Sequence, residues 1–264
     1  MVQKAVSLAL IRGDINTFIP SVMKDERGAP MDQAEIHAQW HAHIDYCQAI
    51  KKYAIIMAPW GHGKTQQVVI ARTLFALGAN RNARIGIVCN SDDNAVKRVS
   101  AIADYVDRDE DYHEVFPWVR PDRGRGWGKQ AFFVERTEGV HSVDPSVFAA
   151  GIFSTGIGGR MDMLIIDDPV DMRNALQMPA LRPVVLAAIT NVWLSRLEPS
   201  GMVVYIATAW HQDDATHQLI RSPDLNSQYC TLIQRINTDY TGIECYLVGS
   251  DPAVEYPVVA GTLE

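Results

Sequence analysis

The feature that most restricts the fold is an apolar run that passes directly into a glycine-rich loop. Residues 53–58 read YAIIMA, and residues 58–65 read APWGHGKT before an amphipathic segment begins. A buried strand, a tight loop and a helix in this order form the setting of a phosphate-binding loop. We therefore expect Lys64 to neutralise phosphate oxygens and the Thr65 hydroxyl to bind Mg²⁺.

The predicted nucleotide-binding residues of this loop are Gly61, His62, Gly63, Lys64, Thr65 and Gln66. The first glycine of the usual pattern is replaced by Ala58. A strand, turn and helix that merely contain the letters GKT are therefore the alternative interpretation of this segment.

A second element, MLIIDDP at residues 163–169, places two carboxylates after four apolar residues. In a buried strand of an open α/β sheet these carboxylates emerge at the C-terminal edge, where ligands bind. We expect Asp167 to hold Mg²⁺ and Asp168 to act as the general base on the attacking water. The alternative is that the two aspartates cap the following turn.

The third element is VVYIATAWHQDD at residues 203–214, a strand with polar residues at its end. Thr208 is expected to sense the γ-phosphate, and the indole of Trp210 to pack under the sheet edge beside His211. A strand end with an aromatic anchor is the competing interpretation.

From residue 53 onward, short apolar runs alternate with amphipathic helices, which is typical of a mainly parallel sheet flanked by helices. Residues 1–50 are predicted to be a helical lead-in, and residues 1–264 a single domain. Among the expected strands are residues 53–58, 84–89, 131–135, 146–152, 163–167 and 202–208.

Composition sets the broad class of the protein. The net charge of −7 provides no general attraction to nucleic acid, and the four cysteines contain no CxxC pair, which fits a reducing compartment. The histidines at 37, 41 and 43 are not expected to bind metal, because no cysteine or carboxylate is expected to complete a ligand shell. No stretch has membrane-spanning length, so a soluble intracellular protein is expected.

The loop at residues 117–130 interleaves Arg120, Arg123, Arg125 and Lys129 with tryptophans. It is interpreted as a DNA contact, a subunit contact or a solvated loop.

Together these elements resemble the ATPase half of the large terminase subunit of tailed bacteriophages. The matching segments are GHGKT, STGIGGRMDMLIIDDP and ATAWHQDD, and they lie within roughly residues 35–220. The segment HAQWHAHI resembles the adenine-side segment of that family, which makes Gln39 and Trp40 nucleotide-binding candidates. The resemblance implies a P-loop NTPase of the RecA/ASCE-like kind that requires ATP and Mg²⁺.

The resemblance further implies a motor that drives viral double-stranded DNA into a capsid in the cytoplasm of the infected host cell. Its partners would be a portal protein, a small terminase subunit and further copies of itself in a ring, with no membrane. Thr208, Trp210 and His211 would couple hydrolysis to movement. The nuclease domain of the family is expected to be absent from this chain.

Many relatives carry an arginine where this loop has Gly61. Arg160, at the end of STGIGGR, is therefore the candidate for a catalytic arginine donated to a neighbouring subunit. A solvated loop arginine is the alternative. Two other functions stay open from the residues: an ATP-dependent helicase or nucleic-acid remodeller, and a non-catalytic nucleotide-binding assembly switch.

Overall fold

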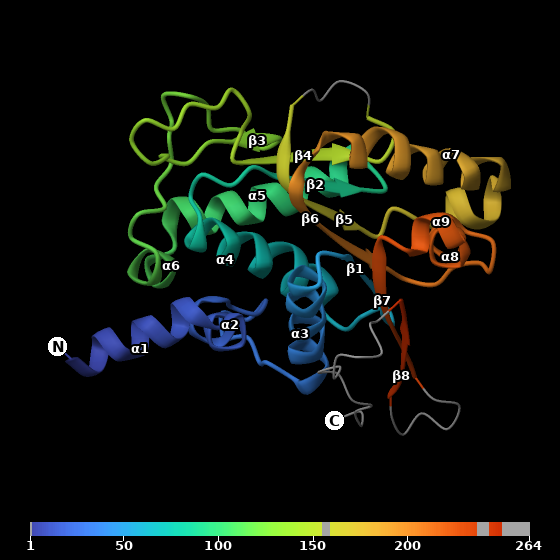
Figure 1. Ribbon diagram of the computed structural model, residues 1–264. Helices are drawn as coiled ribbons and strands as arrows, with labels where there is room; N and C mark the ends of the chain where they lie inside the picture. Colours follow the sequence, from blue (N-terminus) through green and yellow to red (C-terminus); the bar gives the residue numbers. More distant parts are fainter. Residues whose placement is uncertain (1, 155–158, 237–242, 250–264) are drawn as a thin grey trace.

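The computed structural model describes residues 2–154, 159–236 and 243–249, and within them eight strands form one sheet (Figure 1). The strands are β1 (Tyr53–Met57), β2 (Ile85–Cys89), β3 (Ala131–Phe132), β4 (Val147–Gly151), β5 (Met161–Asp167), β6 (Leu197–Ala207), β7 (Tyr229–Ile236) and β8 (Ile243–Val248). Their order across the sheet is β3-β4-β2-β5-β6-β1-β7-β8.

Helices fill most of the chain between the strands. The α-helices are α1 (Val2–Gly13), α2 (Ile15–Val22), α3 (Glu35–Ala49), α4 (Arg72–Ala79), α5 (Asp92–Arg108), α6 (Glu110–Val115), α7 (Arg182–Ala187), α8 (Ala215–Arg221) and α9 (Pro223–Asn226). Shorter π- or 3₁₀-helical segments are η1 (Thr65–Ala71), η2 (Arg173–Gln177), η3 (Pro179–Leu181), η4 (Ala188–Trp193) and η5 (Leu194–Arg196).

The sheet is mainly parallel, as the alternation of strands and helices predicts. Strands β4, β2, β5, β6, β1 and β7 run parallel, and only the edge strands β3 and β8 are antiparallel. The expected strand at residues 131–135 is shortened to two residues. Phe133 instead exchanges backbone hydrogen bonds with Gly126 and Asp122, so residues 133–135 pair with the preceding loop rather than with the sheet.

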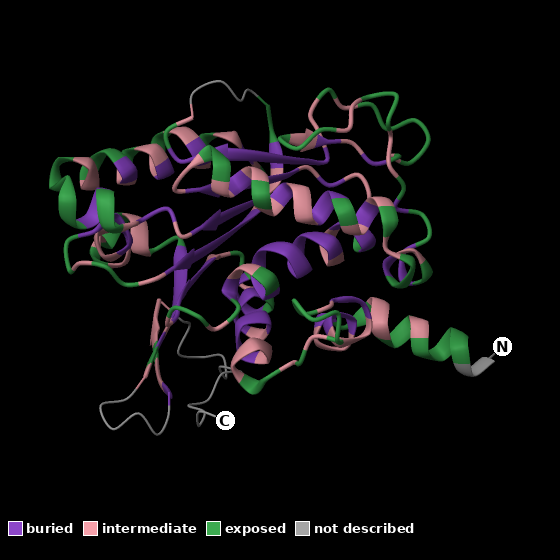
Figure 2. Cartoon of the chain, turned by 180° about the vertical axis from the view of Figure 1, so that it is seen from behind, coloured by how far each residue is buried: buried purple, intermediate pink, exposed green. Residues whose placement is uncertain are grey.

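The sheet separates two hydrophobic cores, and Figure 2 shows its buried strands between the two helical layers. Successive residues of a strand point to opposite faces. Accordingly Ile56, Ile87 and Ile206 join the core under α3, η1, α4 and α5, whereas Ile55 and Val88 join the core under α7, η4 and α8. Nearly every residue of these strands is buried, which is typical of parallel strands covered on both faces.

The chain before β1 forms α1, α2 and α3, which lie in the lower left and centre of Figure 1. The Phe18 ring of α2 is fully buried and packs at 5.5 Å from Phe75 of α4 and at 5.7 Å from Phe116, measured between ring centroids. Within the described residues, no helix has the length and apolarity needed to cross a bilayer.

His43 holds α3 against the sheet. Its Nε2 lies 3.1 Å from the Ile55 carbonyl of β1 and 3.0 Å from the Cys230 carbonyl of β7. Carbonyl oxygens only accept hydrogen bonds, so Nε2 carries the proton. Burial lowers the pKa of His43 to about 4, and the two hydrogen bonds only partly offset this effect.

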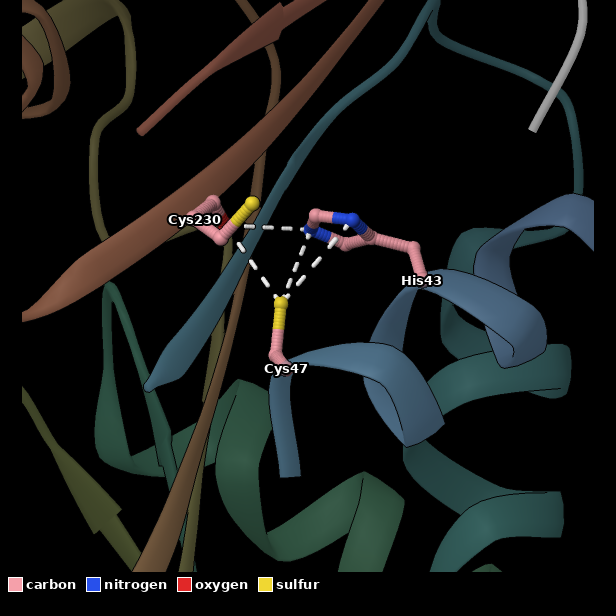
Figure 3. A group of neighbouring side chains, drawn as sticks. All are labelled: His43, Cys47 and Cys230. Atoms are coloured by element: carbon pink, nitrogen blue, oxygen red, sulfur yellow. Dashed lines mark hydrogen bonds between the residues drawn. The ribbon is translucent and has the colours of Figure 1, made fainter. Parts of the chain in front are cut away.

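The sequence did not reveal that two cysteines lie near these histidines. Cys47, one helical turn after His43, and Cys230 of β7 lie beside the imidazole (Figure 3). The spacing within α3 places Cys47 on the same face as His43, and the approach of β7 brings Cys230. The group offers three ligands where structural zinc takes four, and its Nε2–H is already bound to carbonyls. We therefore interpret it as a packing cluster.

The buried neutral state of His43 predicts a specific loss of stability in acid. Its folded pKa is about 4 and its unfolded pKa about 6.5, so between these values the unfolded chain binds a proton that the folded protein does not, and stability falls as the pH falls. From pH 7.5 to 5.0 this residue should cost on the order of 2 kcal/mol. His43→Gln should reduce the pH-dependent loss by that amount in urea unfolding, with His141→Gln, at an exposed position, as the control substitution. An identical pH dependence in His43→Gln and wild type would contradict the assignment.

Candidate functional site

The candidate site lies at the edge of the sheet where the parallel strands end. The register pairs Cys89 with Asp167 and Asp167 with Ile206, and it pairs Met57 with Ala207. The loops that follow β1, β2, β5 and β6 therefore leave the sheet at the same edge. This alignment brings the three sequence elements together although they are separated along the chain.

The loop after β1 owes its shape to glycine. Gly61 and Gly63 have φ angles of +84° and +76°, a region that residues with a Cβ avoid. His37 of α3 supports the loop from behind: its Nε2 lies 3.1 Å from the His62 carbonyl, and its Nδ1 lies 3.3 Å from the Ala34 N–H. This pattern assigns the proton to Nε2. Burial lowers the pKa of His37, which favours the neutral ring.

Lys64 begins the helical segment after the loop, and its side chain is turned inward. The ammonium donates to the carbonyls of Ala58 and Pro59, each at 2.9 Å, and to the Thr208 hydroxyl at 3.0 Å. Lys64 is only 5% exposed. Burial lowers the pKa of this ammonium, and the negative charges of Asp168 and Asp167 oppose that effect.

Asp168 has an unusual backbone conformation with a functional consequence. Side chains of consecutive strand residues point to opposite faces, so an extended Asp167–Asp168 pair would be divided by the sheet. Asp168 instead has a φ of +44°, and its carboxylate accepts a 3.0 Å hydrogen bond from Thr208 Oγ1. Lys64, Thr208 and Asp168 thus form a continuous hydrogen-bonded chain across the ends of β1, β6 and β5.

Asp167 is the most buried charge of the site, with its side chain 1% exposed. Its Oδ2 accepts from Thr65 Oγ1 at 3.3 Å and from Arg98 Nε at 3.1 Å. Its Oδ1 is buried without a hydrogen-bond partner among the described residues. Burial raises the pKa of Asp167, Arg98 opposes that rise, and the neighbouring Asp168 adds to it.

The capping alternative for the two aspartates does not describe this segment. Neither carboxylate bonds to the turn that follows. That turn begins at Asp171, which exchanges two hydrogen bonds with Asn174, at 3.0 and 2.9 Å.

The remaining loop residues are accessible. Gly61, Gly63 and Gln66 are exposed, and His62 and Thr65 are partly exposed. The predicted adenine-side pair, Gln39 and Trp40, lies on α3 and contacts β7. Trp40 is fully buried and donates its indole N–H to Gln234 of β7 at 2.6 Å, and the same glutamine donates to Gln39 at 2.7 Å. Their binding role stays a prediction, with His37 of the same helix lying against the loop instead.

Of the three predicted coupling residues, the structure places only Thr208 in the hydrogen-bonded site. Thr208 lies within the site, but Trp210 is 37% exposed, so the expected packing of its indole under the sheet edge is wrong. The backbone N–H groups of Trp210 and His211 both bind Asp214, and the His211 ring accepts from the Asp213 N–H at 3.0 Å. Asp214 thus holds the backbone of this segment in a turn.

Arg160 lies at the opposite edge of the sheet. It is exposed, it directly precedes β5, and its backbone N–H donates to Asp144 at 3.2 Å. Strand β5 is seven residues long and separates Arg160 from Asp167 by roughly 20 Å. Arg160 therefore lies too far away to reach the carboxylates of its own chain. Residues 155–158 of the glycine-rich segment lie outside the described residues.

The arginines of the 117–130 loop are engaged within the chain. Arg123 pairs with Asp107, Arg125 donates to the Ser142 carbonyl and lies over the Phe133 ring, and Arg120 donates to the Pro117 carbonyl. These contacts order the loop. The proposed contact of this loop with DNA stays a prediction.

Sequence reasoning missed Arg98. It lies on α5 and reaches Asp167 because α5 follows β2, the strand next to β5. The apolar spacing of α5 is visible in the sequence, but the order of the strands is not. No local signal therefore distinguishes Arg98 from the other polar residues of this helix.

The sequence matches no family model and no curated protein. Among solved structures, the chain is similar to the crystal structure of the HK97 bacteriophage large terminase, with a TM-score of 0.57 and 14% sequence identity. The similarity covers 86% of this chain and 44% of that chain, so this chain spans less than half the length of that terminase. At this identity the comparison shows a terminase-like α/β fold.

The positive φ of Asp168 predicts an order of stabilities. Asn populates the left-handed region more readily than Ala, so Asp168→Ala should be about 1 kcal/mol less stable than Asp168→Asn in urea unfolding without nucleotide. Asp104, an exposed residue of α5, provides the control, because Ala should there be the more stable substitution through its helix propensity. Equal stability of the two Asp168 variants would show that its backbone is not strained in solution.

Proposed function

We propose that this chain is the Mg²⁺-dependent ATPase part of a motor that packages viral double-stranded DNA. The observation that carries the proposal is the hydrogen-bonded chain Lys64–Thr208–Asp168 beside the Thr65–Asp167 contact, at the mouth of a glycine loop. The terminase-like fold supports the choice of DNA packaging over other ATP-driven functions. No observation specifically favours the helicase or switch alternatives.

The residues at the edge fit a phosphate-bound Mg²⁺. Thr65 and Asp167 supply the oxygen ligands that this hard cation prefers, and Asp167 Oδ1 is a buried carboxylate oxygen without a partner among the described residues. When bound, Mg²⁺ would neutralise negative charge on the phosphate oxygens. The exposed backbone at Gly61 and Gly63 would face the phosphates, and Lys64 would leave the two loop carbonyls to pair with them.

Hydrolysis would proceed by attack of water on the γ-phosphorus, with cleavage of its bond to the β–γ bridging oxygen, giving ADP and phosphate. Asp168 would orient the water and accept its proton. Thr208 contacts both Lys64 and Asp168, so a change at the phosphates would reach the end of β6 through its hydroxyl. We propose that this contact couples hydrolysis to DNA movement.

Removing the ammonium group of Lys64 tests the proposal most directly. Lys64→Ala should abolish ATP hydrolysis and weaken nucleotide binding, because the β- and γ-phosphates lose the cation of the loop. Phosphate release with and without double-stranded DNA is the measurement, and exposed Lys97→Ala is the matched control. Unchanged turnover in purified Lys64→Ala would remove the assignment.

Asp168→Asn serves as the companion variant. It keeps the shape and leaves Asp167 in place, so Mg·ATP should still bind while hydrolysis falls steeply. Loss of ATP binding together with hydrolysis would assign Asp168 to metal binding or structure. Nucleotide binding without any phosphate release in the wild type, with DNA present and at high protein concentration, would favour the assembly switch.

Because Arg160 lies too far from the carboxylates of its own chain, a catalytic role for it would require a neighbouring subunit, which a mixing experiment tests. Arg160→Ala should bind ATP and hydrolyse it poorly, and Lys64→Ala should be inactive. In a mixed ring, an Arg160→Ala subunit has an intact loop and receives Arg160 from its Lys64→Ala neighbour, so partial hydrolysis should return. Absence of hydrolysis at every mixing ratio, although mixed rings form, would exclude Arg160 as the donated arginine.

A further inference from the structure

Arg98 joins the candidate site from a helix outside the three sequence elements. Its Nε donates to Asp167 Oδ2 at 3.1 Å, and the same oxygen accepts from the Thr65 hydroxyl at 3.3 Å. The guanidinium therefore shares a carboxylate oxygen with Thr65, beside the loop where the proposed function places the phosphates. Its side chain is 27% exposed, whereas that of Asp167 is 1% exposed, so the arginine is the more accessible partner of this ion pair.

Few other cations can act here within one chain. Position 61 of the loop is glycine, and Arg160 lies at the other edge of the sheet. Among the described residues, Lys64 and Arg98 are the basic side chains that hydrogen-bond to this polar cluster. Together they balance the two negative charges of Asp167 and Asp168 before any ligand binds.

Binding of the proposed substrate would upset this balance. A divalent cation held by Asp167 repels a guanidinium on the same carboxylate, and a triphosphate brings several negative charges to the site. Within the described part of the chain, Arg98 donates a hydrogen bond through its Nε. Its terminal N–H groups form the planar fork that matches phosphate oxygens.

We propose that Arg98 is a γ-phosphate-binding arginine supplied by the same chain, held on Asp167 until nucleotide enters. The inference rests on the proposed ATPase function and adds a residue to it. In the free protein Arg98 compensates the buried charge of Asp167. In the complex it exchanges that carboxylate for the oxygens of the terminal phosphate, so the site distinguishes a triphosphate from a diphosphate.

A purely structural role is the competing explanation. If Arg98 only neutralises Asp167, its removal destabilises the fold and weakens both nucleotides equally. A contact with the terminal phosphate instead affects the triphosphate alone. The ratio of the two affinities therefore separates the explanations, and it does so without a measurement of turnover.

The experiment compares wild type, Arg98→Ala and Arg98→Lys, with Arg108→Ala as the control. Arg108 lies on the same helix with its side chain 78% exposed. Dissociation constants for ADP and for the β,γ-imido analogue of ATP are measured by calorimetry with Mg²⁺. Arg98→Ala should weaken binding of the analogue at least tenfold relative to ADP. Its kcat should decrease by a factor of about 10³–10⁵, the range typical of arginine fingers. Arg98→Lys keeps a positive charge beside Asp167 but lacks the planar fork of N–H groups. It should therefore lose part of the preference for the triphosphate analogue over ADP.

The outcomes separate this inference from the function beneath it. If wild type binds and hydrolyses ATP but both Arg98 variants keep the wild-type affinity ratio and kcat, the inference fails and the ATPase assignment stands. The same conclusion follows if Arg98→Ala weakens both nucleotides equally while its melting temperature falls. If wild type binds neither nucleotide under any condition, both the proposed function and this inference are wrong.

Discussion

The parallel register of the central strands is the constraint on which the site depends. Because β1, β6, β5 and β2 end at one level, the residues after them meet without any long connecting segment. Thr208 then needs only its hydroxyl to join Lys64 to Asp168. A one-residue shift of β6 would turn Thr208 to the other face and break this chain.

Buried charge shapes the rest of the edge. A carboxylate as enclosed as Asp167 is costly unless it is paired. Thr65 and Arg98 share one of its oxygens, and the other has no partner among the described residues. The same arrangement that leaves this oxygen free also fits it for a cation. Asp168 has a different energetic cost. It presents a second carboxylate on the same side of the sheet only because its backbone adopts a left-handed conformation.

Charged residues have different roles at the two ends of the parallel strands. At the edge where β2, β5 and β6 begin, Arg84 donates to Asp162 at 2.7 Å and to Glu198 at 2.9 Å, so its charge is satisfied by neighbouring strands. At the opposite edge the loop backbone is exposed and Lys64 is held by carbonyls that a ligand can replace. The first edge stabilises the sheet, whereas the second is arranged to exchange partners.

The sequence alone determined the class of fold and the three segments of the site, because apolar runs, glycines and paired carboxylates are local signals. It predicted Lys64, Thr65, Asp167, Asp168 and Thr208 at one edge, and the structure brings these five together. Tertiary structure decided what local patterns do not contain. The strand order brought Arg98 to Asp167. The packing of α3 against β7 buried Trp40 beside Gln234. These contacts depend on which elements become neighbours, a choice made by the packing of the whole sheet.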